Sequence, residues 1–443
     1  MILKPKDVKW IGFKFLDTNS HTFFYNGIYY KAILPDTKTS NSILNILLTN
    51  LFEQGFIPET IPAEFNIEGF SQIYHQKTEF FHLCVSEAPF DAIKNSAILY
   101  LNILSSLLKH NYALIDGHTS NIIFQKNTKP LWCDIGSIVP YSQEVFRSAF
   151  DQFIQYFIYP LLVREKSPYL ETIARRGLSE GISHNLFYIL TNNTKFYNII
   201  KRISLTPKEI IDTTLDHIDT INFSYAKTGW SEYDKYPEDI NIDTRPVPGK
   251  NNREAVITST LKAIHPKYLV DVGANAGRYS RLAAKLGAHE ILSIEPDSVA
   301  IAKSWLVLQQ DAFPIKLLQK GISLTPFKQP GDTAMALALT HHLFFTEKMP
   351  FRLIASCLAA YTTQHLLTEF MPHGMSGKDK PTELPQDYSL ENFTKQLERH
   401  FASVSVIEYP FPADSSPRIL ILCSKKRESP LDDGLGNLNR PPV

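Results

Sequence analysis

The C-terminal half of the sequence predicts an α/β domain built on a mostly parallel sheet, and three observations predict it. Residues 268–280 form a short apolar strand, a tight turn crowded with small residues, and a helix. From residue 251 to residue 424, predicted strands and helices alternate, which favours parallel strands. The last two strands, at 403–409 and 418–423, are joined by a short proline-rich loop and should pair antiparallel.

The turn after the first of these strands has the pattern of a nucleotide-binding loop. Backbone N–H groups at the start of the helix can approach a ligand there, because small residues leave room. A dinucleotide fingerprint needs a third glycine where this sequence has Arg278, which argues against a nicotinamide cofactor. Asn275 stands at the middle position of a G-x-G-x-G row, and asparagine tolerates left-handed backbone angles. The candidate cofactor-binding residues of this row are Asp271, Gly273, Ala274, Asn275 and Gly277.

This row resembles the first motif of class I S-adenosylmethionine-dependent methyltransferases, in which an acidic residue precedes the glycines. A second strand at 288–296 ends at Glu295, near the position where a carboxylate reaches ribose hydroxyls in such folds. We therefore expect S-adenosylmethionine as the cofactor and Glu295 as a ribose ligand. A parallel sheet closed by an antiparallel hairpin is also the Rossmann-like layout of that family. The alternative is a simple βαβ unit whose Glu295 is a solvated strand end.

The N-terminal region predicts an α+β fold followed by helices. Asn26-Gly27 is a strong two-residue hairpin signal between aromatic runs, and residues 42–54 have helical spacing of apolar residues. Strand-like sequence follows at 80–85, and a long helix is expected at 91–110. An apolar helical face begins at 144 and is expected to stop at Pro160. Further helices are expected at 170–175, 186–200 and 207–218.

The chain is expected to divide into domains at a segment rich in glycine, proline and charge. The expected regions are an N-terminal region at 1–222, a linker at 223–250, the α/β domain at 251–424 and a disordered tail at 425–443. Within the α/β domain the expected helices are 252–264, 278–286, 297–310, 351–361 and 390–401. Its remaining strands are expected at 315–318, 333–339 and 364–370.

A second motif lies in the N-terminal region. Asp116 and Asn121 have the D-x-x-x-x-N spacing of a protein-kinase catalytic loop, and Asp134 opens an Asp-Ile-Gly triplet where a metal-binding D-F-G would stand. This region resembles a kinase-like C-lobe, and Lys31 is a weak candidate for its phosphate lysine. The sequence lacks a glycine-rich loop before the motif and has Leu114-Ile115 where a His-Arg pair is usual. We therefore expect a degenerate domain with a vestigial nucleotide and magnesium site, or a regulatory nucleotide pocket.

Composition argues against several other classes. Lys plus Arg and Asp plus Glu both number 45, so overall charge does not favour nucleic-acid binding. The four cysteines are widely separated and suggest neither a disulfide framework nor a metal site. No apolar run reaches membrane-spanning length, and no signal peptide is evident, so we expect a cytoplasmic protein, with export by an unread signal left open.

Candidate catalytic residues follow the fourth and fifth strands of the α/β domain. Ligands of open parallel sheets bind beyond the carboxyl ends of the strands. His341 and His342 follow the fourth strand, and Glu369 lies near the end of the fifth. A histidine near neutral pKa suits a base that deprotonates a hydroxyl acceptor, and Glu369 could orient it. The alternative is that one histidine caps the next helix and the other faces solvent.

The order of the parts resembles a bacterial family in which a kinase-like region precedes a class I methyltransferase, and relatives of it are nodulation-type methyltransferases. The resemblance runs from about Phe23 to Lys425. One departure is Lys320-Gly321 after the third strand, where such enzymes often have an acidic residue near the adenine amine. The methyl acceptor, a small molecule or a protein, and the oligomeric state stay open. The alternative functions are a kinase-like phosphotransferase and a non-catalytic protein that binds a nucleotide or a partner.

Overall fold

The computed structural model describes residues 1–11, 19–26, 28–35, 40–77, 79–201, 205–226, 228, 252–310, 312–322, 329–375, 381–407 and 417–429. The chain forms two compact units, Met1–Ala226 and Lys227–Val443. Most of the predicted linker at 223–250 and of the predicted tail at 425–443 lies outside the described residues.

The N-terminal unit begins with a small antiparallel sheet and one helix. The sheet order is β2 (Lys9–Ile11), β3 (Ser20–Tyr25), β4 (Ile28–Ile33), β7 (Gln72–Gln76) and β5 (Thr60–Pro62), and a short parallel pair joins β1 (Ile2–Leu3) to β6 (Asn66–Ile67). The predicted hairpin is present, because Tyr25 pairs with Ile28 and Asn26 has a left-handed φ of 49°. Helix α1 (Asn41–Glu53) follows, with its leucine face buried as predicted.

The rest of this unit is mainly helical. Two short antiparallel pairs, β8 (Tyr112–Leu114) with β11 (Ile138–Pro140) and β9 (Ile122–Gln125) with β10 (Lys129–Trp132), follow the long helix α2 (Phe90–Leu108). The later helices are α3 (Gln143–Phe153), a π-helix at Ile154–Ile158, α4 (Tyr159–Lys166), α5 (Glu171–Glu180), α6 (His184–Thr191), α7 (Lys195–Lys201) and α8 (Pro207–Thr220).

Three sequence predictions for this unit are wrong. Residues 80–85 do not form a strand. They form an irregular segment that leads into a 3-10 helix at Val85–Glu87, and the Phe81 side chain in this segment is buried. The helical face does not stop at Pro160, because the π-helix at Ile154–Ile158 runs directly into α4, and Pro160 lies just after the junction, where the backbone hydrogen-bond pattern changes. The segment 186–200 is two helices, since Asn192 ends α6 with a left-handed φ of 56°.

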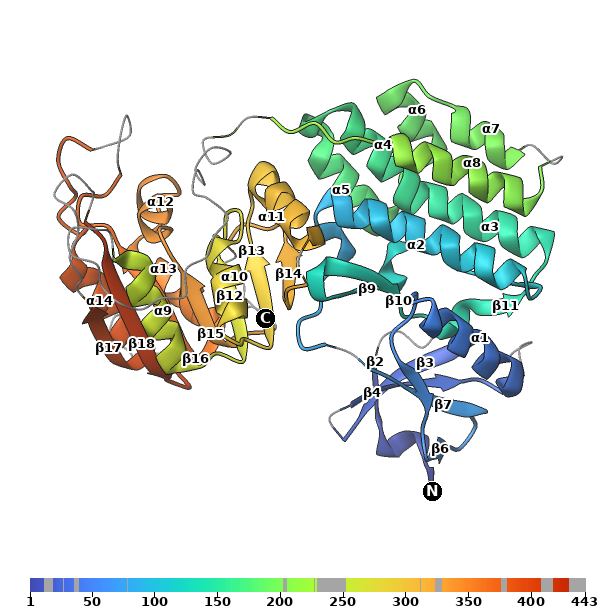
Figure 1. The fold of residues 1–443 in the computed structure, drawn as a ribbon, viewed down its shortest axis with the longest axis horizontal. Helices are drawn as coiled ribbons and strands as arrows, with labels where there is room; N and C mark the ends of the chain where they lie inside the picture. Colours follow the sequence, from blue (N-terminus) through green and yellow to red (C-terminus); the bar gives the residue numbers. More distant parts are fainter. Residues whose placement is uncertain are drawn as a thin grey trace. The chain divides into compact units, whose positions relative to one another are not determined.

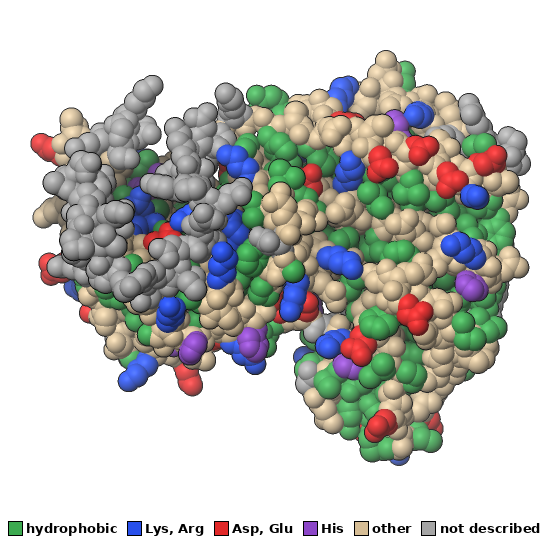
Figure 2. Space-filling model, in the orientation of Figure 1, with side chains coloured by type: hydrophobic (Ala, Val, Ile, Leu, Met, Phe, Trp, Pro, Cys, Tyr) green, Lys and Arg blue, Asp and Glu red, His purple; other side chains and the backbone are tan. Residues whose placement is uncertain are grey.

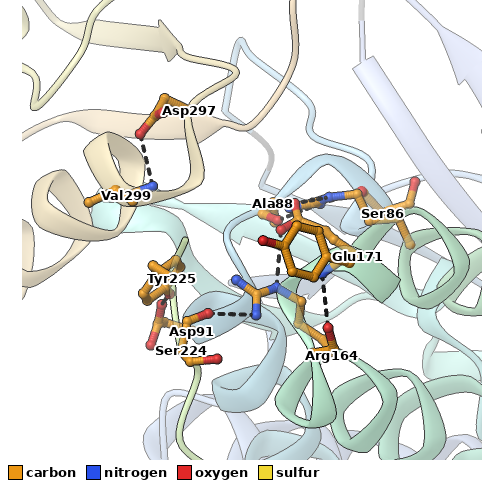
Figure 3. A network of polar contacts seen from close by, with 12 residues as sticks. Ser86, Ala88, Asp91, Arg164, Glu171, Ser224, Tyr225, Asp297 and Val299 are labelled. Atoms are coloured by element: carbon orange, nitrogen blue, oxygen red, sulfur yellow. Dashed lines mark hydrogen bonds and ion pairs between the residues drawn. The ribbon is translucent and has the colours of Figure 1, made fainter. Parts of the chain in front are cut away.

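A buried arginine joins the end of this unit to its helices. Arg164 in α4 is fully buried, donates to Glu171 at 3.0 Å and to the Ser224 carbonyl at 2.9 Å, and lies 5.1 Å from the centre of the Tyr225 ring. The Tyr225 hydroxyl donates to Asp91 at 2.9 Å (Figure 3). The chain leaving the N-terminal unit is therefore fixed to α2, α4 and α5.

The C-terminal unit is built on a seven-stranded sheet, shown in Figure 1. Its order is β14 (Ile315–Leu318), β13 (Glu290–Ile294), β12 (Tyr268–Val272), β15 (Gly331–Ala336), β16 (Thr362–Phe370), β18 (Ile419–Lys426) and β17 (Phe401–Ile407). The first five are parallel, and β18 pairs antiparallel with both β16 and β17. The predicted α/β fold class and antiparallel last pair are confirmed.

Helices lie between these strands in the predicted alternation. They are α9 (Arg253–Ile264), α10 (Arg278–Lys285), α11 (Ser298–Gln310), α12 (Thr340–Phe345), α13 (Phe351–Ala360) and α14 (Leu390–Glu398). The strand predicted at 333–339 is shorter and ends at Ala336, and α12 follows it. Residues of β13 and β14 are buried along their whole length, as in parallel sheets covered on both faces.

Charged side chains of both signs share the surface of the N-terminal unit in Figure 2. Lys and Arg side chains alternate there with Asp and Glu, in keeping with the equal totals of 45. Within the described part of the chain, no helix is long and apolar enough to cross a bilayer.

Candidate functional site

The glycine turn joins β12 to α10 and depends on left-handed backbone angles. Gly273, Asn275 and Gly277 have φ values of 73°, 50° and 77°. Asn275 is held in this conformation by its own side chain, because its Oδ1 accepts from the Ala276 N–H at 2.8 Å. A Cβ at Gly273 would lie 3.2 Å from Leu339 Cδ1, so even the smallest side chain is tight there. The conformation of the turn therefore depends on which residue stands at each of these three positions.

Glu295 lies directly after β13 and faces this turn. Its Oε2 accepts from the Asn275 N–H at 2.7 Å, and its Oε1 accepts from the Asp297 N–H at 2.8 Å. Burial raises the pKa of Glu295 to about 7, although the two backbone hydrogen bonds act in the opposite direction. Each carboxylate oxygen can accept a second bond, so the group can still receive ribose hydroxyls.

Asp271, the acidic residue of the motif, points into the fold. Its Oδ2 accepts from the Ser280 hydroxyl at 2.6 Å, and Ser280 lies 2.6 Å from the Ser293 hydroxyl. Burial raises the pKa of Asp271 to about 7. This carboxyl therefore links β12 to α10 and β13 and holds the glycine turn in shape.

The two candidate histidines lie in α12. His341 is buried, and its ring centre lies 3.9 Å from that of the partly buried His342. The Nδ1 of His341 is buried and has no hydrogen-bond partner among the described residues. Burial, His342 and Arg418 lower the pKa of His341 to about 3, although Glu369 acts in the opposite direction. His341 is therefore neutral near pH 7 and is a weak base in this state.

Glu369 lies beside the histidines and is bound to arginine. It is fully buried, and Arg253 donates to both of its oxygens, at 2.6 and 2.7 Å. Burial raises the pKa of Glu369, but Arg253, Arg418 and the Ala338 N–H outweigh burial, so the pKa lies below its ordinary value. An ionised carboxylate held in this way orients its neighbours and is poorly suited to act as a base.

Sequence reasoning missed Arg253, Arg418 and Tyr279, which surround Glu369. Arg253 also donates to the Tyr279 hydroxyl and lies 4.8 Å from the centre of that ring. One signal was available: Arg253 is the first residue of α9, and a cation at a helix N-terminus opposes the helix dipole. Such a residue needs a partner elsewhere, but the sequence does not identify the partner.

In the N-terminal unit the structure brings two of the kinase-like candidates together. Lys31 Nζ lies 3.1 Å from Asp134 Oδ1, and that oxygen also accepts from the Gly136 N–H at 3.3 Å. Asn121 is buried, and within the part of the chain that the structure describes its Nδ2 has no hydrogen-bond partner, whereas Asp116 is half-buried. Across the described residues, no group of three or more His, Cys, Asp or Glu side chains is arranged to hold a metal ion.

Comparisons with known proteins give distant similarities. No protein family matches the sequence. The chain is similar to nodulation protein NoeA of Rhizobium meliloti (strain 1021), with 22% identity over 365 residues, or 70% of this chain and 74% of that protein. The solved structure of TehB from Haemophilus influenzae is similar over 39% of this chain and 62% of its own, at a TM-score of 0.30 and 17% identity.

A second solved structure is a Listeria monocytogenes protein assigned as an S-adenosylmethionine-dependent methyltransferase. It matches 39% of this chain and 99% of its own, with a TM-score of 0.29 and 15% identity. The match to TehB spans less than two thirds of that protein. The predicted resemblance is confirmed at the level of a nodulation protein. The kinase-like N-terminal region stays a prediction.

Proposed function

We propose that the C-terminal unit binds S-adenosylmethionine at the Gly273 turn and transfers its methyl group to an acceptor. The observation that supports this most directly is the bond from the Asn275 N–H to Glu295 Oε2 at 2.7 Å. It fixes a carboxylate beside a glycine turn, at the carboxyl ends of two adjacent parallel strands. This is the place and the chemistry that a nucleoside with free ribose hydroxyls requires.

In this proposal each part of the site has a separate task. The N–H groups of the turn and the Glu295 carboxylate hold the adenosyl part, and the bound sulfonium supplies an electrophilic methyl group. The turn at 338–340 and the first residues of α12 border the place of the acceptor. Transfer then depends on an in-line approach of the acceptor atom, which positioning alone can accelerate greatly. The acceptor itself is unidentified, and His341 or His342 would contact it.

Isothermal titration calorimetry with S-adenosylmethionine tests the proposal directly. We expect saturable binding at one site per chain, and a similar affinity for the demethylated product, because both share the adenosine. A protein that binds neither molecule, while circular dichroism shows intact secondary structure, would contradict the proposal. Radiolabelled methyl transfer to a metabolite or protein mixture then identifies the acceptor.

Replacement of Glu295 should weaken cofactor binding in a pH-dependent way. Glu295→Ala removes bonds to a charged acceptor and should cost about 1–3 kcal/mol of binding free energy. Because the pKa of Glu295 is raised to about 7, protonation below that pH removes the better acceptor, so wild-type affinity should fall as pH decreases from about 8 to 6. Calorimetry across this range should show the dependence in the wild type and its loss in Glu295→Gln.

The same titration has the opposite effect on folding. A carboxyl whose pKa is higher in the folded state than in the unfolded state stabilises the fold when it takes up a proton. The unfolding free energy of the unliganded wild type, relative to Glu295→Gln, should therefore rise as pH falls through about 7. Glu398→Gln, at an exposed position of α14, serves as the matched control. Equal pH profiles in all three proteins would contradict the raised pKa of Glu295 in the folded state.

We infer that the N-terminal unit transfers no phosphate. Lys31 is paired with Asp134 at 3.1 Å, so the two groups that a magnesium nucleotide would need are bound to each other. With radiolabelled ATP and either magnesium or manganese, we expect no transfer to protein or small molecules. Transfer that Asp116→Asn abolishes would make the chain bifunctional. Binding of ATP without turnover would instead support a regulatory nucleotide pocket.

A further inference from the structure

The turn that leads into α12 is strained. Ala338 has a φ of 52°, in the left-handed region that residues other than glycine rarely adopt. It lies between the end of β15 at Ala336 and the first residue of α12 at Thr340. Strained backbone persists only where the surroundings fix it, and it concentrates at functional sites. The groups that hold Ala338 therefore decide where α12 and His341 lie.

Glu369 holds this turn on both sides. Its Oε2 accepts from the Ala338 N–H at 2.8 Å, and its main-chain carbonyl accepts from the Thr340 hydroxyl at 2.6 Å. Both acceptors belong to one buried residue of β16, so the turn is joined to the neighbouring strand by a side chain and by the backbone. Loss of the carboxylate geometry would release Ala338 and would leave Thr340 as the remaining contact.

Glu369 in turn depends on a residue far away in sequence. A fully buried carboxylate is unfavourable unless it has a countercharge and hydrogen bonds. Arg253, in the first turn of α9, supplies both through two parallel bonds at 2.6 and 2.7 Å. Arg418 lies farther away, with Nη1 at 3.6 Å from Glu369 Oε2. The bidentate pair fixes the plane of the carboxylate as well as its charge.

The same turn also borders the cofactor loop. Leu339, the residue after Ala338, packs over Gly273, where an added Cβ would meet its Cδ1 at 3.2 Å and its Cδ2 at 3.3 Å. A displacement of the turn at 338–340 would therefore change the space above the glycine turn as well as the burial of His341. One strained segment thus separates the cofactor side of the site from the acceptor side.

We propose that Arg253 is a positioning residue of the methyl-transfer site: through Glu369 it holds the Ala338 turn, and thereby places Leu339 against the glycine loop and His341 at the acceptor side. The catalytic part of this proposal, the effect of Arg253 on methyl transfer, rests on the proposed function. Its structural part, the dependence of the His341 environment on Arg253, stands by itself and can be measured without cofactor or acceptor.

The experiment compares Arg253→Met with Arg278→Met in the full chain. Arg278 pairs with Glu254 at 2.7 Å. The substitution Arg278→Met therefore removes a second ion pair from the same end of α9 and leaves the contacts of Glu369 in place. The imidazole signals of His341, assigned by their loss in His341→Gln, are followed by NMR over a pH titration. His342, Arg418 and Glu369 are the groups that influence this ring. Cofactor affinity is measured on the same samples by calorimetry.

In the wild type and in Arg278→Met, we expect His341 to remain neutral throughout the range from pH 5 to 8. In Arg253→Met we expect it to titrate within that range, because the released turn admits water, and cofactor affinity should fall by about tenfold or more. The double variant Arg253→Met with Glu369→Gln should recover both properties to within about threefold, because a neutral amide accepts from Ala338 without needing a countercharge.

Three results would overturn the proposal. The first is a His341 titration in Arg253→Met that matches the wild type. The second is an equal change of the His341 titration and of cofactor affinity in Arg253→Met and Arg278→Met. The third is a double variant in which neither property recovers. The double variant shows whether the effect of Arg253 runs through the charge of Glu369, and circular dichroism of Arg253→Met separates a displaced turn from an unfolded protein. If the wild type binds no S-adenosylmethionine, the proposed function fails, while the His341 titration still decides the role of Arg253.

Discussion

Gly273→Val is expected to abolish binding of S-adenosylmethionine, with a loss of affinity of at least about 100-fold. The native φ of 73° is rarely adopted by a β-branched residue, and the new Cβ would lie 3.2 Å from Leu339 Cδ1. Leu339 can shift to relieve the contact, but the φ strain is relieved only by movement of the turn, and its N–H groups would then no longer face the cofactor. Calorimetry with S-adenosylmethionine measures the loss, and circular dichroism shows whether the sheet is intact.

The matched control is Gly287→Val, just beyond the C-terminal end of α10. Gly287 also has a positive φ, 97°, but no atom of the described residues, its chain neighbours aside, lies within 4 Å of an added Cβ. It therefore carries comparable backbone strain without the steric contact. We expect Gly287→Val to lose stability but to keep its cofactor affinity. If both variants bind the cofactor equally well, the glycine turn is not the binding loop.

Arg164→Ala is expected to destabilise the N-terminal unit by about 1–3 kcal/mol, the range for leaving buried groups without a hydrogen-bond partner, because Arg175 still pairs with Glu171 at 3.0 Å. Arg164 is fully buried among Phe90, Phe223 and Tyr225, and it donates to Glu171 and Ser224. Its loss leaves a cavity and an unsatisfied carbonyl at the end of the unit. Urea unfolding followed by far-ultraviolet circular dichroism measures the shift in midpoint.

Arg176→Ala provides the comparison for Arg164. Arg176 pairs with Glu180 on the exposed face of α5, with side chains 75% and 58% exposed. Exposed pairs contribute little, so its removal should change the unfolding free energy by less than about 0.5 kcal/mol. Similar effects of the two substitutions would mean that the buried network does not fix the end of the unit.

The parts of the candidate site that depend on neighbouring residues in the chain follow from the sequence. The glycine turn follows from small residues between an apolar strand and a helix, and Glu295 follows from its place at the next strand end. The structure brings Glu295 within hydrogen-bond distance of Asn275, because adjacent parallel strands end at the same edge. Local sequence and the rule of parallel strands were sufficient for this half of the site.

The other half depends on pairs that sequence spacing does not reveal. Arg253 and Glu369 are 116 positions apart, and neither has a local pattern that names the other. Two local predictions also failed. Pro160 lies within a helical segment at the start of α4, and the strand before His341 ends at Ala336, before α12 begins. The sequence also could not show that His341 is buried and neutral, because both properties arise from contacts made only in the folded chain. The predicted role of His341 as a base did not take them into account.

The place of β18 in the sheet has a consequence for how the chain is made. It is the last of the seven strands in sequence, yet it lies between β16 and β17, and Leu420 is the partner of Glu369 in the pairing. During synthesis the glycine turn, Glu295 and Arg253 are complete long before β16 gains this neighbour. A nascent chain that stopped before Ile419 would leave an edge of β16 open to pairing with other chains. Ribosome stalling late in translation would therefore yield an aggregation-prone product, although the glycine turn and Glu295 had already been made.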